Sequence, residues 1–454
     1  MAADTSSLKI GRVVTASSFG FAIVQLDVTI VNVALPHIGA DLQTGVAGLQ
    51  WVVDAYALVF ATLLLSAGFL ADRFGARRLY LAGQCVFALA SLSCGLAGGP
   101  VTLIAGRAVQ GIAAAAMLPS SLALLNHASA HDARLRAWAV GWWTAASSVA
   151  IAAGPIIGGL ILAVAGWRAI FLVNLPICAI GVLLTWRLPE AERTGGGRGF
   201  DPLGQILSIL ALACLVGAVI EAKPLGLFHP LVLAGFGLGI CAAAGFVAAE
   251  ARALHPMLPL KLFRAPSFGG CVAYGMVVNL TYYGVIFLLS LYLQRGLGYS
   301  ALATGFAFLP LTASFFAVNI LSGPLVGRLG SRRPMIWGAL IDAVGFALLL
   351  RLGGSSSYFA MIAPFALIPI GMGTGVPAMT TAVLAAVPKE FSGVGAAVLN
   401  AARQAAGAVG VALFGALSGE DVSHVVWGLH ISAVIAITLL CTAAIFAMVI
   451  SQPK

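Results

Sequence analysis

The sequence predicts an all-α polytopic membrane protein with 14 transmembrane helices. Of its 454 residues 61% are hydrophobic and 9% are charged, whereas soluble proteins average about 25% charged residues. The charged residues collect between apolar stretches, and 14 of these stretches approach the roughly 20 residues that a helix needs to cross a bilayer. The stretches are continuously apolar, whereas a membrane β-barrel alternates over segments of about 10 residues.

The predicted spans begin with the first apolar stretch. This stretch is too long for the hydrophobic part of a secretory signal peptide and lacks a convincing cleavage site, so we interpret it as a membrane span. The 14 spans are expected near 13–36, 50–70, 79–97, 101–125, 138–165, 168–186, 203–222, 230–249, 268–294, 302–327, 335–352, 358–384, 395–418 and 426–450.

The basic residues predict the orientation, because Lys and Arg are retained on the cytoplasmic side of a membrane. Both termini and alternate loops carry 18 of the 24 basic residues, the opposite loops carry four, and Arg107 and Arg403 lie inside spans. We therefore expect a multi-pass protein of the cell inner (plasma) membrane with both termini in the cytoplasm. The net charge of +9 does not indicate a nucleic-acid partner, since the basic residues are divided among short loops.

An internal repeat predicts two pseudo-symmetric six-helix bundles. Residues 68–78 and 323–333 agree at six of eleven positions with an offset of 255. Duplicated halves are typical of transporters, and this offset makes the ninth span the counterpart of the first. The expected division is an N-terminal bundle over 1–190, a linker with two inserted helices over 191–265, and a C-terminal bundle over 266–454.

Several segments resemble one family. The segment 68–78 resembles the loop between helices 2 and 3 of the major facilitator superfamily, residues 107–111 resemble its helix-4 motif, and residues 154–159 are similar to its antiporter motif. Residues 26–36 and 167–176 are similar to one branch, the 14-helix drug:proton antiporters. The resemblance implies multidrug or antibiotic efflux by alternating access.

The segment 68–78 is a candidate gating loop. The resemblance implies that it latches the two bundles together on the cytoplasmic side, although its arginines also fit plain membrane topology. The second copy has Gly327 where the first has Asp72, so only the first copy can supply an acidic latch. The expected gating residues are Gly68, Asp72, Arg73, Gly75, Arg77 and Arg78.

The fifth span carries Gly154, Gly158 and Gly159 together with Pro155. Small residues four apart allow helices to approach closely in a membrane, and a proline can bend a helix. We expect this segment to pack tightly between the bundles and to limit leakage. That it belongs to an antiporter is implied by the resemblance alone.

Five charged residues lie well inside the predicted spans, where a charge is costly and usually faces a cavity or a partner. They are Asp27, Asp54, Arg107, Asp342 and Arg403. Burial raises the pKa of a carboxyl group in general and a nearby cation lowers it, so changes in hydration can load and release a proton. We expect Asp27 to carry the coupled proton, Arg107 to modulate its affinity, and Asp54 to assist or to meet a cationic substrate. A static ion pair is the alternative, and for Asp342 a hydrogen bond between helices is as good an interpretation as a transport role.

Aromatic and polar residues of the later spans are candidates for a substrate cavity, because aromatic faces with a few polar groups suit a lipophilic or cationic ligand. Contact with lipid is the alternative for most of the aromatic residues. Related exporters often carry acids in helix 10 or 13, and none occurs in those spans here, which argues against divalent cations. The candidates are Gln110, Asn279, Tyr282, Tyr283, Asn319, Asn400, Arg403 and Gln404.

We therefore interpret the chain as a proton-coupled exporter of small hydrophobic or cationic compounds, whose partners are the substrate, protons and the lipid bilayer. The alternatives are a dedicated exporter of one natural product, a proton-coupled importer and a non-transporting receptor.

No enzyme is expected, because the sequence shows no nucleotide-binding loop and no nucleophile–base pair. No cofactor or metal is expected either, since the seven cysteines lie singly in apolar spans. The sequence does not determine whether a periplasmic adaptor takes part.

Overall fold

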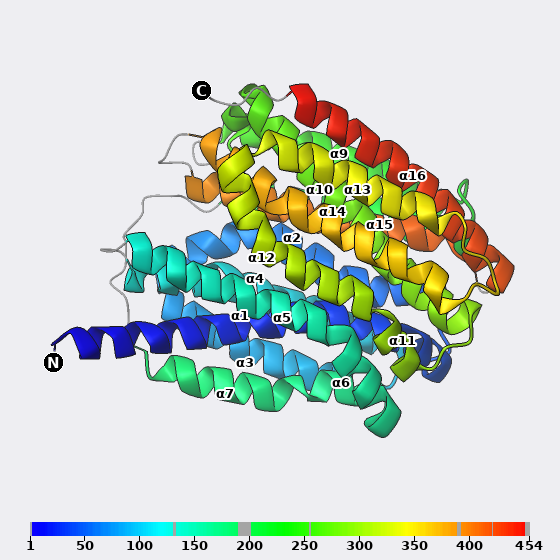
Figure 1. Ribbon diagram of the computed structural model, residues 1–454, viewed down its shortest axis with the longest axis horizontal. Helices are drawn as coiled ribbons and strands as arrows, with labels where there is room; N and C mark the ends of the chain where they lie inside the picture. Colours follow the sequence, from blue (N-terminus) through cyan, green and yellow to red (C-terminus); the bar gives the residue numbers. More distant parts are fainter. Residues whose placement is uncertain are drawn as a thin grey trace.

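The structure is a computed structural model that describes residues 2–129, 133–188, 201–253, 256–387, 392–419 and 421–449. The described residues form a bundle of long, roughly parallel helices and contain no strand, which confirms the all-α class (Figure 1). Helix α1 begins, and α16 ends, at one end of the bundle, which we call the terminal end. We call the other end the distal end.

The first part of the bundle contains seven helices. α1 packs against α4 and α5, α4 also packs against α2 and α3, and α7 lies against α1 and α3. The predicted span 168–186 is broken into α6 and α7, because Pro176 lacks the N–H that would bond to the carbonyl group of Leu172. The bounds are α1 Ala2–Asp41, α2 Val46–Phe74, α3 Ala76–Gly95, α4 Pro100–Ala128, α5 Ala133–Ala165, α6 Arg168–Leu172 and α7 Asn174–Trp186.

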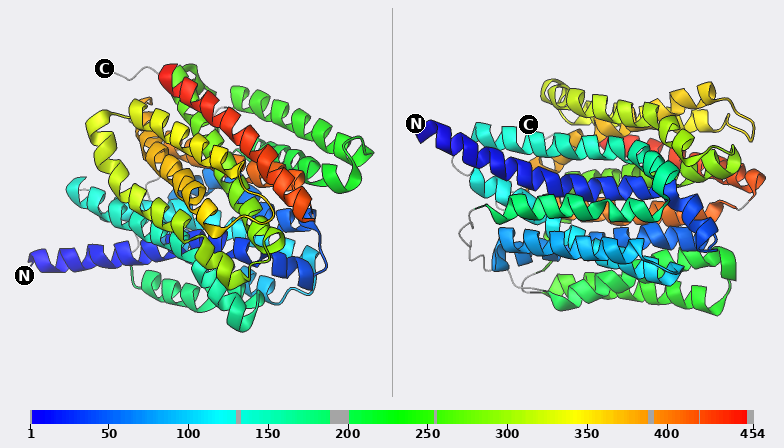
Figure 2. Two further views of the ribbon diagram at one scale, coloured as in Figure 1. Left: turned by 45° about the vertical axis from the view of Figure 1, so that its right-hand side comes forward. Right: turned by 90° about the horizontal axis from the view of Figure 1, so that it is seen from below.

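Two helices, α8 (Pro202–Leu225) and α9 (Pro230–Arg252), form an antiparallel pair at the edge of the bundle (Figure 2). The side chain of Asp201 begins α8 by accepting a hydrogen bond of 2.8 Å from the N–H of Gly204. α8 lies against α2 and α15, whereas α9 packs mainly on α8. These are the helices that the sequence predicts as an insertion.

The remaining helices form the second part of the bundle. The predicted span 302–327 is broken at Phe308, because Pro310 in the next turn has no N–H to continue the helix. The bounds are η1 Leu260–Arg264, α10 Pro266–Leu291, η2 Tyr292–Gly296, α11 Ala301–Ala307, α12 Leu309–Leu329, α13 Arg332–Leu349, α14 Tyr358–Ala385, α15 Ser392–Leu417 and α16 Val422–Val449.

Helices occupy every predicted span, but not all of them qualify as membrane spans by length and hydropathy. Within the described residues 11 helices qualify, or 12 if the two parts of bent α5 are one span. α3 and α13 are not among them, because each begins with a pair of arginines that lowers the hydropathy of the helix. The number 14 is therefore not confirmed.

The repeated segments 68–78 and 323–333 have corresponding structures. Most of the predicted gating loop is helical, because α2 continues to Phe74, and the chain turns only at Gly75, with a φ of 95°. Gly330, which lies 255 residues later, turns with a φ of 71°. A positive φ strains other residues, so glycine suits both turns.

Each turn is followed by an arginine that binds the end of another helix. Arg77 donates to the carbonyl oxygen of Trp186, at the end of α7, at 2.5 Å. Its counterpart Arg332 donates to the carbonyl oxygen of Met448, near the end of α16. Both arginines thus satisfy carbonyl groups that a helix end leaves without an intrahelical partner.

Candidate functional site

Asp27 and Arg107 form an ion pair inside the bundle. Asp27 lies in α1 and Arg107 in α4, and the two residues are 0% and 1% exposed. A terminal guanidinium nitrogen of Arg107 donates to one carboxylate oxygen of Asp27. Neither charge would be stable alone at this depth, so each stabilises the other.

Three further polar side chains complete a network around this pair. Gln110 accepts a hydrogen bond of 2.8 Å from Arg107 and donates to the hydroxyl group of Ser91, also at 2.8 Å. Asn174 donates to the second carboxylate oxygen of Asp27 at 3.0 Å. Helices α1, α3, α4 and α7 thus each contribute a polar group to one buried network.

The other side of Arg107 faces α2. Its Nε donates to the carbonyl oxygen of Val52 at 3.1 Å, and its guanidinium group lies 4.5 Å from the centre of the Tyr56 ring. A cation over an aromatic ring is stabilised by the ring's electrons, most strongly when both are shielded from water. Arg107 therefore connects Asp27 with α2.

Asp54 lies apart from this network. Its carboxyl group is fully buried, and neither oxygen has a hydrogen-bond partner. Asp54 is three residues from Trp51 and four from Leu58, so it shares a face of α2 with both. That face contacts both α8 and α15, because the indole N–H of Trp51 donates to Glu221 of α8 at 3.0 Å, and Leu58 packs in one cluster with Val216 of α8 and Ala412 of α15.

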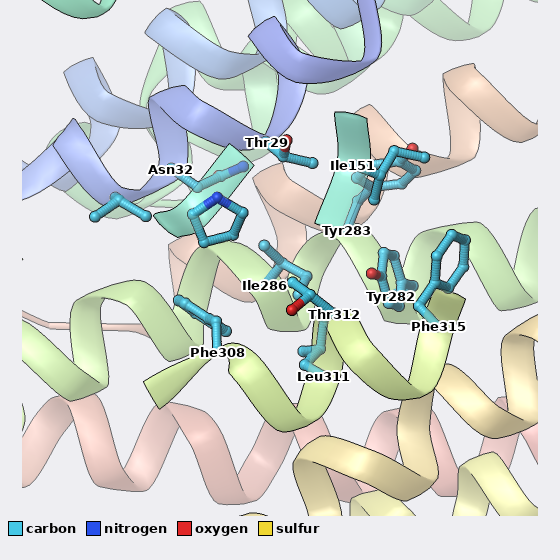
Figure 3. Close-up of a pocket in the computed structure, with 12 residues that line it drawn as sticks. Thr29, Asn32, Ile151, Tyr282, Tyr283, Ile286, Phe308, Leu311, Thr312 and Phe315 are labelled. Carbon is cyan, nitrogen blue, oxygen red and sulfur yellow. The ribbon is translucent and has the colours of Figure 1, made fainter. Parts of the chain in front are cut away.

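A first pocket lies between α1 and α5 on one side and α10 and α12 on the other (Figure 3). Side chains of α1, α10 and α12 converge on it, and most of them are aromatic or aliphatic. The polar groups are few, which is typical of sites for small apolar ligands. The lining residues are Thr29, Asn32, Val33, Ile151, Pro155, Tyr282, Tyr283, Ile286, Phe308, Leu311, Thr312 and Phe315.

A second pocket lies between α1, α2 and α4 and the helices α10 and α15. Arg107 lines it, so the ion pair borders this pocket, and Tyr283 lines both pockets. The lining residues are Val28, Val31, Val53, Tyr56, Ala57, Phe60, Arg107, Tyr283, Gln404, Gly407, Ala408 and Val411.

The candidate cavity residues are distributed unevenly. Tyr282, Tyr283 and Gln404 line pockets, whereas Gln110 is buried in the polar network. Arg403 is half-buried, and its Nε has no hydrogen-bond partner. Asn279 and Asn319 donate to carbonyl groups of their own helices, at 3.0 and 2.8 Å, and Asn400 is exposed. These last three residues line neither pocket.

The glycines of α5 lie at two helix contacts. Added Cβ atoms on Gly154 and Gly158 would meet Thr29 and Ile30 of α1. A Cβ on Gly159 would lie 2.9 Å from the carbonyl oxygen of Ala301, at the start of α11. Gly159 thus lets α5 approach a helix of the other sequence repeat.

Hydrogen bonds between the repeats close the distal end. Ser290 donates to the carbonyl oxygen of Asn32 at 2.5 Å, and Gln294 donates to that of Val33 at 2.9 Å. Gln50 of α2 donates to the carbonyl oxygen of Ala412, in α15, at 2.6 Å. The two halves are therefore in polar contact at this end.

The sequence pattern described as Major Facilitator Superfamily matches residues 17–411. The chain belongs to this superfamily. The methylenomycin A resistance protein of Streptomyces coelicolor is 38% identical over 416 residues, which cover 91% of this chain and 87% of that protein. The multidrug resistance protein Stp of Mycobacterium tuberculosis is 37% identical over 402 residues, which cover 88% and 74%. The puromycin resistance protein of Streptomyces alboniger is 37% identical over 402 residues, which cover 87% and 79%.

Solved structures of other transporters have a similar fold. A bacterial homologue of the human lysosomal transporter Spinster, in an inward-facing and unoccupied conformation, has a TM-score of 0.70 at 18% identity, with 97% of both chains covered. The nucleoside transporter NupG has a TM-score of 0.69 at 10% identity and covers 98% of this chain. These similarities concern the fold of this superfamily member and not its substrate.

Sequence reasoning missed part of the site of this superfamily member. Ser91 and Tyr56 gave no signal, since serine and tyrosine are common in membrane helices. Asn174 had a signal, because it lies in the segment 167–176 that carries the family resemblance. Thr29 and Asn32 lie in the segment 26–36 in the same way, and both line the first pocket.

Proposed function

We propose that the protein is a proton-coupled secondary active transporter that exports small hydrophobic or cationic compounds across the plasma membrane. One observation carries the proposal: the buried Asp27–Arg107 pair borders a pocket between the two sequence repeats. An ionisable pair inside a membrane bundle usually marks an ion pathway. The names of the relatives, which are antibiotic and multidrug resistance proteins, support this class of substrate.

The proposed architecture has 14 membrane spans. The bundles 1–190 and 266–454 rock about the pockets between them, and the segment 191–265 supplies the linker and the two inserted helices. The distribution of 18 of the 24 basic residues supports a cytoplasmic location for both termini. The terminal end then faces the cytoplasm, and the closed distal end faces outward.

In the proposed cycle Asp27 accepts and releases the coupled proton. Protonation removes the negative charge that holds Arg107, so the guanidinium group becomes free to change its contacts with Tyr56 and Gln110. Arg107 borders the second pocket, so a change in its position alters the surface that a substrate meets. Asp54 assists from the α8-facing side of α2, through the position of that helix.

Two motifs would control the opening of the ends. The glycines of α5 keep the distal end closed through the contact between Gly159 and Ala301. At the terminal end, Arg77 fixes the turn after α2 to the end of α7. The proposed acidic latch, Asp72, has a side chain outside the described ones, so this role rests on the sequence.

A dedicated exporter of one natural product is the second candidate. The relatives favour neither candidate over the other, because their names include resistance to single antibiotics and to many drugs. A proton-coupled importer differs from an exporter in the direction of substrate-driven proton movement. A receptor differs from both, because its substrate drives no proton movement. A panel of dyes and antibiotics in a pump-deficient host distinguishes a broad from a narrow substrate range.

The decisive experiment compares wild type with Asp27→Asn in liposomes that carry a pH gradient. We expect the wild type to accumulate substrate against its gradient and the variant to fall to the level of empty liposomes, because asparagine does not release a proton. The matched control is Asp421→Asn, since Asp421 is an exposed carboxylate at the distal end and should be replaceable without loss. Accumulation by a folded Asp27→Asn protein at the wild-type rate contradicts the coupling role.

A further inference from the structure

Asp342 is a carboxyl group that the proposed cycle does not use. It lies in α13, ten residues after Arg332, which is about 15 Å along a helix with a rise of about 1.5 Å per residue. That distance reaches the middle of a hydrocarbon layer about 30 Å thick. The residue is 0% exposed.

A close crossing of α13 and α14 covers Asp342. A Cβ added to Gly371 of α14 would lie 2.5 Å from the Cβ atom and the backbone nitrogen of Asp342. One turn away on each helix, a Cβ added to Gly338 would lie 2.9 Å from the backbone nitrogen of Gly375. Only glycine permits such an approach, so the backbone of α14 lies directly on Asp342.

The carboxyl group of Asp342 has no partner. Neither oxygen accepts or donates a hydrogen bond, whereas Asp27 has Arg107 and Asn174 as donors. An unpaired negative charge in an apolar interior is far more costly than a neutral carboxylic acid. The surroundings of Asp27, in the first repeat, thus stabilise the charged form of its side chain. The surroundings of Asp342, in the second repeat, stabilise the neutral form.

Helix α10 connects Asp342 with the first pocket. Tyr274 of α10 reaches α13 at Met335, and both helices run from the terminal to the distal end, so Tyr282, eight residues after Tyr274, lies at about the level of Asp342, seven residues after Met335. The hydroxyl group of Tyr274 is engaged, because it donates to the carbonyl oxygen of Met335 at 2.8 Å. Tyr282, in contrast, lines the pocket, where its ring stacks on Phe315 at 6.1 Å between centroids.

No cation neutralises Asp342 among the described residues. His430 of α16 is bonded to the carbonyl oxygen of Leu352 at 2.7 Å, and the arginines of α12 and α13 lie at the ends of these helices. α10 carries Cys271 and three tyrosines, and the other titratable or charged side chains on α12, α13, α14 and α16 are Arg328, Arg332, Arg333, Tyr358, His424, His430 and Cys441.

We propose that Asp342 is a second proton-binding site of the transport cycle. In the conformation described here it is a neutral acid, and it loses its proton to water when a rearrangement of Tyr282 opens a path from the first pocket. The O–H bond breaks, the proton leaves with pocket water, and a carboxylate remains until the site closes. The inference rests on the proposed proton coupling and adds a carrier in the second repeat.

Infrared spectroscopy of the purified protein tests the protonation state directly. We expect wild type to show the carbonyl-stretch band of a protonated carboxylic acid, and we expect Asp342→Asn and Asp342→Ala to lose that contribution. Asp421→Asn is the control and should keep it, since Asp421 is exposed. Raising the pH should weaken the contribution of Asp342 as conformations with an ionised group become populated. An unchanged band in both folded Asp342 variants, or a contribution that does not respond to pH, overturns the proposal.

Transport measurements test whether this proton is coupled. Liposomes with a fixed pH gradient are loaded with ethidium as the cationic probe, and the limiting accumulation is compared. This limit is the ratio of the ethidium concentrations on the two sides of the membrane. A gradient of about one pH unit supplies about 1.36 kcal/mol per coupled proton, which is a factor of about ten in that ratio, so the loss of one coupled proton lowers the limit about tenfold. An unchanged limit in Asp342→Asn overturns this inference. If liposomes with the wild-type protein show no gradient-driven accumulation, that result contradicts the proposed function instead. The infrared measurement then still determines the protonation state of Asp342.

Discussion

At the scale of single residues, the environment of each buried charge decides its chemistry. Asp27 has a guanidinium group and an amide as donors, whereas Asp54 and Asp342 have no hydrogen-bond partner. The same side chain is therefore held as a carboxylate in the first case and is more stable as a neutral acid in the other two. Arg107 is the residue on which the network depends, because it contacts Asp27, Gln110 and α2 at once.

Removal of Arg107 should therefore destabilise the protein strongly. We expect Arg107→Gln to lower the free energy of unfolding by about 3–5 kcal/mol, because it leaves the carboxylate of Asp27 buried and unpaired. The double variant Asp27→Asn/Arg107→Gln should recover much of this loss, since both charges are gone. Thermal unfolding in detergent measures both effects, with Arg351→Gln as an exposed control. A single variant as stable as wild type contradicts the pairing.

Residue-level reasoning from the sequence found the ionic components of the site but not their arrangement. Asp27 and Arg107 both lie well inside their predicted spans, and the structure brings them together. Asp54 also lies well inside its predicted span, yet it is on the face of α2 that contacts α8 and α15, because the rotation of α2 about its axis depends on packing. No local pattern in the sequence gives that rotation.

At the scale of helices, glycines determine where neighbouring helices can approach closely. α5 reaches α1 and α11 through separate glycines, whereas Gly141 of the same helix has no atom within 4 Å of an added Cβ. Sequence spacing predicts close packing of α5 but does not identify the neighbours. The breaks between α6 and α7 and between α11 and α12 also follow from prolines, although prolines such as Pro119 leave their helix continuous. Whether a proline breaks a helix depends on whether neighbours satisfy the freed carbonyl group.

A larger residue at Gly159 should loosen the distal end. We expect Gly159→Val to cost about 1–3 kcal/mol in the closed conformation, because its side chain overlaps the backbone at Ala301. A cysteine introduced at Thr312, in a background without native cysteines, should then react faster with a membrane-impermeant thiol reagent added outside. Gly141→Ala is the matched control in the same helix. Equal labelling rates in Gly159→Val and the control exclude α5 as a closing element.

At the scale of the whole molecule, hydrogen bonds join the two repeats within the described residues, and the proposed cycle requires these bonds to break when the distal end opens. The bonds from Gln50 and Gln294 to backbone carbonyl groups lie at the distal end. The inserted helices lie outside this interface, with α8 against both α2 and α15. A pair of helices that contacts both repeats can support their motion without lining either pocket.

Loss of the distal hydrogen bonds should shift the conformational equilibrium. A typical hydrogen bond contributes about 0.5–1.5 kcal/mol net, and about 1.4 kcal/mol is tenfold in population. We expect Gln50→Leu with Gln294→Leu to raise the fraction of molecules that are open at the distal end several-fold. Spin labels at Gly98 and Ser355 report the distance across this end. Thr438→Val is the control, since Thr438 bonds only within α16, and a distance distribution identical to that of the control argues against the contact as a gate.

The sequence by itself determined the membrane class, the positions of the helices, the duplication and the buried charges, because these properties depend on local hydropathy, on repeats and on charge counts. Only the tertiary structure decided which charges are paired, because pairing depends on how helices rotate and cross. Thus Asp27 meets Arg107 through the packing of α1 on α4, whereas Asp342 is enclosed without a partner where glycines let α13 and α14 touch. The burial of Gln110 in the network and of Asp54 toward α8 has the same cause.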